Sequence, residues 1–229
     1  MRDEAKVFRE TCRYLGIRGV PADENLTGKI REGIAALEKA AMERSTYARF
    51  PLSVQGTQVT IGGVPAESAK LAKNLAGCET AVLMAVTLGP SVDLLIRRAE
   101  ITDAALASIL QAAGAALAED LADRVNEEIR REAEASGFFV RPRFSPGYGD
   151  FSLSFQETFS RFLNLPKTCG ITLTDAFLMA PSKSITALLG LSRENTACAP
   201  SGCEACSARR TCAYSRETSP ETTVTGDLS

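Results

Sequence analysis

Residues 46–63, TYARFPLSVQGTQVTIGG, decide the fold class, because they contain two short runs rich in β-branched and aromatic side chains. The runs Thr46–Val54 and Thr57–Ile61 predict two strands, and Gly62-Gly63 marks the turn that follows them. Strands joined by short turns pair antiparallel. This stretch therefore favours an antiparallel sheet over the parallel sheet of a regular βαβ protein.

Helical periodicity surrounds this pair of strands. Apolar residues at three- and four-residue spacing predict helices at residues 5–15, from about 23 or 27 to 42, 65–75, 91–100 and 151–163. The longest helix is expected from Thr102, as its N-cap, to about Ala135. Its apolar stripe consists of Leu106, Leu110, Ala113, Leu117, Leu121, Val125 and Ile129.

Further strands are predicted at residues 79–88, 138–140, 176–179 and 184–189, the last two as a hairpin. These elements do not alternate as βαβ units, so the predicted class is α+β. We expect residues 1–191 to form one α+β domain and residues 192–214 to form a cysteine-rich loop. Residues 215–229 contain almost no apolar side chains and are expected to form a disordered tail.

Charge and composition exclude several classes of protein. The formal net charge of −2 argues against a general nucleic-acid binder, which presents a surplus of basic side chains. The absence of histidine excludes Ser-His-Asp and Cys-His nucleophiles and histidine-ligated catalytic zinc. The charged N-terminus and the lack of a continuous apolar span of about 20 residues predict a cytosolic protein without membrane contact.

Four cysteines form the strongest local chemical signal. Cys198, Cys203, Cys206 and Cys212 lie within 15 residues, among small and charged side chains that allow one loop to wrap a metal centre. Thiolates bind iron–sulfur clusters and zinc. The tight spacing favours a [4Fe–4S] cluster, with structural zinc and free or redox-active thiols as the alternatives. The isolated Cys12 and Cys169 are interpreted as small buried residues.

The segment 143–150, RFSPGYGD, is too rich in proline and glycine for regular structure. Two interpretations remain open. Glycines allow a ligand close to the backbone, and Arg143 can bind a carboxylate. Alternatively, the segment is a structural turn that packs Phe144 and Tyr148 into the core. Lys183, in a later turn, is interpreted either as an anion-binding residue or, more simply, as an exposed lysine.

Arg143-Phe-Ser-Pro-Gly-Tyr148 resembles the R-x-x-x-G-Y signature of the reactivation domain of cobalamin-dependent methionine synthase. Residues 170–181, GITLTDAFLMAP, are similar to a segment that follows the signature in that family, and residues 182–190 to the strand after it. Residues 118–125, AEDLADRV, resemble the helix that precedes it. The resemblance extends from about residue 105 to 191.

This resemblance implies a twisted antiparallel sheet with flanking helices and a site for S-adenosylmethionine. By position, Arg143 matches the arginine that holds the ligand carboxylate, and Ser145 and Gly147 match positions whose backbone contacts the ligand. Tyr148 completes the signature. The partner implied is the cobalamin-binding module of a methionine synthase, on which such a domain docks when the cofactor is oxidised to cob(II)alamin.

The chain also departs from the family pattern. An acidic ligand contact in the family falls here on Ala115, four residues before the position that matches Glu119. A tyrosine pair that contacts S-adenosylmethionine falls on Ala197 and Cys198, and a histidine-containing stretch is replaced by residues 149–153. Two expectations follow: S-adenosylmethionine binding is retained beside a new cluster, or it is weakened or lost and the cluster delivers the electron.

The function implied is that of a stand-alone reactivation protein, an accessory component with no catalytic residue of its own. It supports reductive remethylation of cob(II)alamin by S-adenosylmethionine. A cluster suits delivery of the electron, because iron–sulfur potentials extend down to about −700 mV. The alternative is a zinc-stabilised binding module for a corrinoid protein, without redox chemistry. No nucleic acid and no membrane are expected as partners.

Overall fold

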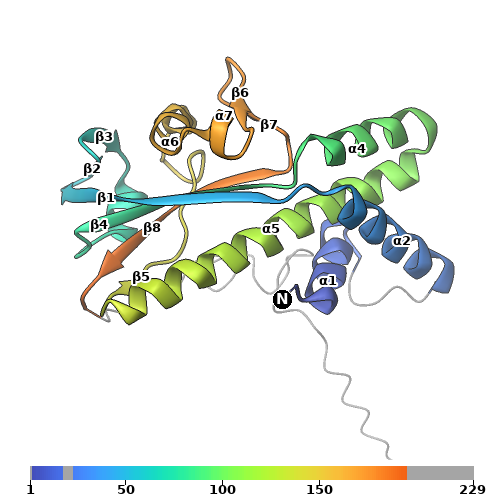
Figure 1. Ribbon diagram of the computed structural model, residues 1–229, viewed down its shortest axis with the longest axis horizontal. Coiled ribbons are helices and arrows are strands. Elements are labelled where there is room, and N and C mark those ends of the chain that lie inside the picture. The colour runs from blue at the N-terminus through green and yellow to red at the C-terminus, as the bar shows by residue number, and fades with distance from the viewer. Residues whose placement is uncertain (1, 18–22, 195–229) are drawn as a thin grey trace, which may run out of the picture.

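A six-stranded antiparallel sheet forms the centre of the computed structural model, which describes residues 2–17 and 23–194 (Figure 1). The strand order is β3-β2-β1-β4-β8-β5. The strands are β1 (Arg44–Gln55), β2 (Gln58–Ile61), β3 (Val64–Glu67), β4 (Thr80–Thr87), β5 (Phe139–Val140) and β8 (Ser184–Ser192). The predicted pair of strands at 46–61 is confirmed as the β1–β2 hairpin, and the predicted α+β class is confirmed with it.

Helices cover both faces of the sheet (Figure 1). One layer contains α1 (Glu4–Tyr14), α2 (Glu24–Ala40), α4 (Pro90–Thr102) and α5 (Ala104–Ala135). The other contains α3 (Ala69–Asn74), a 3₁₀ turn (Leu153–Phe155), α6 (Gln156–Leu163) and α7 (Leu165–Thr168). A separate small hairpin joins β6 (Thr172–Leu173) to β7 (Met179–Ala180).

The central strand β4 contributes alternate side chains to two cores. Val82, Met84 and Val86 pack against the α5 layer, whereas Ala81, Leu83 and Ala85 pack against the α6 layer. Successive side chains of a strand point to opposite faces, so a strand covered on both faces is apolar throughout. This explains why residues 81–86, within the predicted strand 79–88, form an unbroken apolar run.

The expected helix at 65–75 is wrong at its start. Val64–Glu67 form the edge strand β3, which pairs with β2 through the turn at Gly62-Gly63. Pro65 is tolerated there because an edge strand leaves one row of N–H groups unpaired. The helix begins only at Ala69, where the side chain of Ser68 accepts a hydrogen bond from the Leu71 N–H.

The expected hairpin at 176–189 is also wrong. Its first strand is reduced to β7, which pairs with β6, a strand that the periodicity did not reveal. The second strand, β8, pairs with β4 and β5 instead. A two-residue strand carries too little periodicity to be recognised, and pairing between distant strands leaves no local signal.

Helix α5 spans 32 residues and agrees with the longest predicted helix. Its N-cap is Asp103, whose side chain accepts from the N–H groups of Ala105 and Leu106, and not Thr102 as expected. Six of the seven stripe residues are buried, while Leu106 is exposed. Among the described residues, α5 is the one helix long and apolar enough to cross a membrane, but 61% of its most apolar window is buried within the fold, as in a core helix.

Candidate ligand-binding site

The segment 143–150 continues the sheet beyond β5. The Arg141 N–H donates to the carbonyl of Gly190 at 2.8 Å. Phe144 then exchanges both backbone hydrogen bonds with Leu188, at 2.9 and 2.8 Å. The start of the segment is therefore fixed to β8, and Arg143 lies between two anchored residues.

A tight turn follows this anchored part. The Tyr148 N–H donates to the Ser145 carbonyl at 3.1 Å, and the Gly147 N–H donates to the Phe151 carbonyl at 2.8 Å. Gly147 has a φ of +86°, which side chains strongly disfavour. The glycine of the signature thus has a conformational role. Gly147 and Tyr148 are exposed, Ser145 is partly exposed and Pro146 is buried.

The two aromatic residues of the turn have different environments. Phe144 is buried in the core under α6, whereas Tyr148 is 60% exposed and meets Phe144 edge-on, with ring centroids 5.3 Å apart. The structural-turn interpretation therefore holds for Phe144 and is wrong for Tyr148. An exposed tyrosine on a rigid turn is available to stack on a ligand or to bond to it.

Asp150 ties the far end of the turn to α3. Its carboxylate accepts hydrogen bonds from the Ser68 hydroxyl at 2.5 Å and from the Ala69 N–H at 2.9 Å. These bonds to the charged form, the one from Ser68 foremost, lower the pKa of Asp150 below its ordinary value of 3.8. The turn is thus held at both ends, by β8 and by the N-terminus of α3.

Arg143 points to two carboxylates on α5. Its Nη2 donates to Asp123 Oδ1 at 2.6 Å and to Glu119 Oε2 at 3.2 Å. Lys6 of α1 donates to the other oxygen of Asp123 at 2.5 Å. The Arg143 side chain is 22% exposed, and within the described residues all its hydrogen bonds to protein use Nη2. Its remaining N–H donors are therefore open to a ligand carboxylate.

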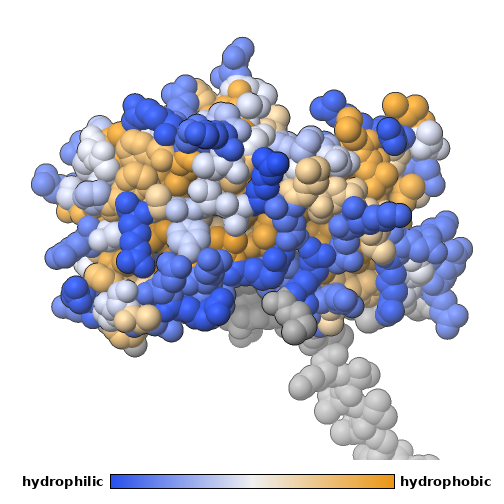
Figure 2. Space-filling model, viewed as in Figure 1, coloured by the Kyte–Doolittle hydropathy of each residue, from blue (hydrophilic) through white to orange (hydrophobic). Residues whose placement is uncertain are grey.

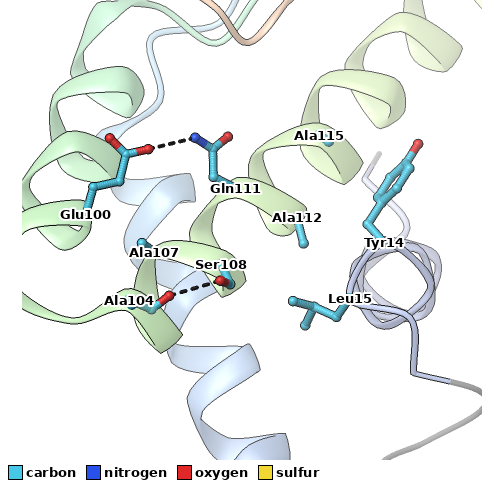
Figure 3. A pocket seen from close by; sticks show the side chains of 9 residues that line it. All are labelled: Tyr14, Leu15, Glu100, Ala104, Ala107, Ser108, Gln111, Ala112 and Ala115. Carbon is cyan, nitrogen blue, oxygen red and sulfur yellow. Dashed lines mark hydrogen bonds between the residues drawn. The ribbon is translucent and has the colours of Figure 1, made fainter.

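A shallow groove of about 690 Å³ lies between α1, the end of α4 and the first half of α5 (Figure 3). Tyr14, Leu15, Glu100, Ala104, Ala107, Ser108, Gln111, Ala112 and Ala115 line it. Ala115 lies one helical turn before Glu119 on α5, whereas Lys6 and Asp123 line a different hollow, of about 590 Å³. Figure 2 shows apolar surface over the outer end of α4, the helix that carries the exposed Leu94 and Ile101.

Lys183 contacts Gln111, one of the residues that line this groove. Its Nζ donates to the Gln111 side-chain oxygen at 2.7 Å, and Gln111 in turn donates to Glu100 at 3.1 Å. The aliphatic part of Lys183 packs over Gly114, and burial lowers the pKa of its amine. The exposed-lysine interpretation is therefore wrong: Lys183 is half-buried and satisfied by protein.

The structure brings Arg143, Ser145, Gly147 and Tyr148 together on one turn and adds Asp123 and Lys6, which the sequence did not single out. The expected metal ligands Cys198, Cys203, Cys206 and Cys212 lie outside the described residues. The described part of the chain contains no cluster of three or more cysteine, aspartate, glutamate or histidine side chains able to hold a metal. Cys12 and Cys169 are buried, as expected.

No protein-family model and no curated protein sequence matches this chain. Among solved structures, it is similar to the crystal structure of the MetH reactivation domain bound to AdoHcy, with a TM-score of 0.58. The sequences are 17% identical, and the match covers 86% of this chain and 78% of that one. The described residues thus adopt the α+β fold of the MetH reactivation domain.

Proposed function

We propose that this chain binds S-adenosylmethionine at the turn 143–148 and acts as a reactivation protein for a cobalamin-dependent methionine synthase. One observation carries the proposal. Arg143, Gly147 and Tyr148, the signature residues, occupy a single accessible turn, on the fold of a domain whose solved structure contains AdoHcy.

The turn offers complementary groups to an S-adenosyl amino acid. Arg143 donates to the ligand carboxylate through the N–H groups that Asp123 and Glu119 do not occupy. The Ser145 N–H and the Gly147 carbonyl, which make no backbone hydrogen bond within the described residues, bind polar atoms of the ligand. The exposed ring of Tyr148 contacts its apolar parts. None of these groups acts as a general acid or base, so the contribution of the turn is to bind and orient the ligand.

The partner in this proposal is the cobalamin-binding module of a cytosolic methionine synthase. One electron reduces cob(II)alamin to cob(I)alamin, which takes the methyl group of S-adenosylmethionine and leaves S-adenosylhomocysteine. Cys198, Cys203, Cys206 and Cys212 are proposed to hold a [4Fe–4S] cluster that supplies this electron. The alternative for the same cysteines is a zinc ion that stabilises a binding module without redox chemistry.

Calorimetric titration with S-adenosylhomocysteine tests the ligand site. The full chain is expected to bind it, and Arg143→Ala is expected to weaken binding at least tenfold, because a charge-assisted carboxylate contact is lost. Arg130→Ala, on the exposed face of α5, is the matched control and is expected to bind as the native chain does. Absence of binding by the native chain would reject the ligand site.

Metal analysis of anaerobically purified protein tests the cluster. About four iron and four sulfide per chain, with a brown colour that dithionite bleaches, are expected for a [4Fe–4S] centre. Reduction of cob(II)alamin bound to a methionine synthase partner is then the functional assay. One zinc per chain without colour would instead support the binding module.

A further inference from the structure

Asp123 connects the N-terminal helix to the proposed ligand turn. Its two carboxylate oxygens have different partners: Oδ1 accepts from Arg143 Nη2 at 2.6 Å, and Oδ2 accepts from Lys6 Nζ at 2.5 Å. Three segments far apart in the sequence, α1, α5 and the turn after β5, therefore meet at one side chain. The side chains of Asp123 and Lys6 are 40% and 41% exposed, so solvent reaches this junction.

The other charged residues near Asp123 on α5 do not replace it as the partner of both Arg143 and Lys6. Glu119, one turn earlier on α5, assists Arg143 at a longer distance of 3.2 Å. Asp120 and Arg124, the neighbouring charged residues of α5, pair with each other at 3.0 Å, and both also pair elsewhere. Asp123 is therefore the acidic side chain that contacts Arg143 most closely.

We infer that Asp123 is a positioning residue, which holds the Arg143 guanidinium toward the carboxylate of the bound S-adenosyl ligand. An arginine side chain loses much rotational freedom when it binds, and a partner that fixes it beforehand reduces this loss. Lys6 occupies the second oxygen of Asp123 and so fixes the orientation of the carboxylate itself. Asp123 does not touch the ligand, and it acts through Arg143.

This inference rests on the proposed ligand site, and it is tested with two ligands. S-adenosylhomocysteine has the carboxylate that Arg143 binds, and adenosine has none. Asp123→Asn is expected to weaken binding of S-adenosylhomocysteine about fivefold and to leave binding of adenosine unchanged. Glu127→Gln removes the same charge one turn further along α5 and is expected to change neither affinity. Within residues 2–17 and 23–194, the Glu127 side chain pairs with Arg130 alone.

A double-mutant cycle separates positioning from a structural role. In the Arg143→Ala background, Asp123→Asn is expected to have no further effect on S-adenosylhomocysteine binding, because Asp123 affects the ligand only by holding the Arg143 side chain. Lys6→Met is expected to weaken binding about twofold in the native chain and not at all beside Asp123→Asn.

The outcomes distinguish the two proposals. Equal losses for S-adenosylhomocysteine and adenosine, equal losses with and without Arg143, or unchanged binding by Asp123→Asn would each overturn the positioning role alone. No binding of S-adenosylhomocysteine by the native chain would overturn the ligand site and the positioning role together. Thermal unfolding of each variant confirms that it is folded when it is titrated.

Discussion

Asp150 caps a helix that begins 81 residues before it: its carboxylate accepts from the Ala69 N–H at the start of α3. Ser68 donates to the same carboxylate and also caps α3 with its own oxygen. Asp150→Ala removes these bonds and leaves the Ser68 hydroxyl without this acceptor. We expect a lower midpoint of thermal unfolding at pH 7, whereas Asp175→Ala, at an exposed position, is expected to have no effect.

The same contact predicts a dependence on pH. Because hydrogen bonds hold the pKa of Asp150 below its ordinary value of 3.8, the unfolded chain takes up the proton first. The stability from this group is fully present above pH 3.8 and is lost as the pH falls through the lower folded value. The difference in stability between the native chain and Asp150→Ala should therefore shrink in acid. A difference that stays constant down to pH 2 would contradict the assignment.

Tyr47 connects β1 to the far half of α5. Its hydroxyl donates to Glu132 at 2.7 Å and to Glu128 at 3.0 Å, and Tyr47→Phe is expected to cost about 1 kcal/mol at pH 7. Desolvation and the two carboxylates raise the pKa of Tyr47 above its ordinary value of 10.0. Its contribution is therefore present below pH 10 and is lost as the pH rises toward the folded value.

Urea denaturation at pH 7 and above pH 10 measures this effect of Tyr47→Phe. The matched control is Tyr148→Phe, since the hydroxyl of Tyr148 makes no hydrogen bond to protein in the described ranges. The control is expected to stay within about 0.5 kcal/mol of the native chain. An equal cost for the two variants would show that the carboxylate contacts of Tyr47 contribute nothing.

Gly190 of β8 lies beside Leu75 and Cys78, in the segment between α3 and β4. A Cβ at this position would stand 2.7 Å from both Cys78 Sγ and Leu75 Cδ2, so Gly190→Ala is expected to destabilise the fold by about 1–3 kcal/mol. Gly28→Ala is the control, because nothing lies within 4 Å and the residue is inside α2. It is expected to stabilise by about 0.5–1 kcal/mol. Denaturation of both variants in guanidinium chloride measures the two changes.

The cysteines are tested separately from the tail that follows them. Replacement of Cys203 and Cys206 by serine is expected to remove bound iron, because two of four thiolate ligands are lost. A chain that ends at residue 214 is expected to retain its full iron content, measured as iron per chain after anaerobic purification. Loss of iron in the shortened chain would show that residues 215–229 take part in the site.

Local sequence signals predicted those elements whose periodicity is strong. The β1–β2 hairpin and α5 are of this kind, since their apolar residues repeat over many positions. β3 was assigned to a helix because four residues that include Pro65 show no clear alternation. The pairing of β8 with β4 could not be foreseen, because it depends on contacts between residues about one hundred positions apart.

The candidate site also contains residues that the sequence identifies and residues that only the structure reveals. Gly147 and the arginine of the signature stand out in the sequence by residue type and spacing. The partners of Arg143 do not, since α5 carries several acidic residues and only the packed structure shows which of them face the turn. Lys183 was misjudged because a lysine in a turn is usually exposed, whereas here a glycine on α5 makes room for its side chain.

The register of β8 has a consequence for the order in which the site forms. Thr87 of β4 pairs with Ser184 of β8, and Leu188 of β8 holds the backbone of Phe144. The pairing of β4 and the position of the proposed ligand turn therefore both depend on β8, the last described strand. Closing so large a loop is slow, and domains rich in such distant contacts fold slowly. On the ribosome, residues 143–148 are made about forty residues before Leu188, which holds Phe144, so the proposed ligand turn would be incomplete over that interval. Ligand-binding competence should therefore appear late and abruptly, once β8 has emerged.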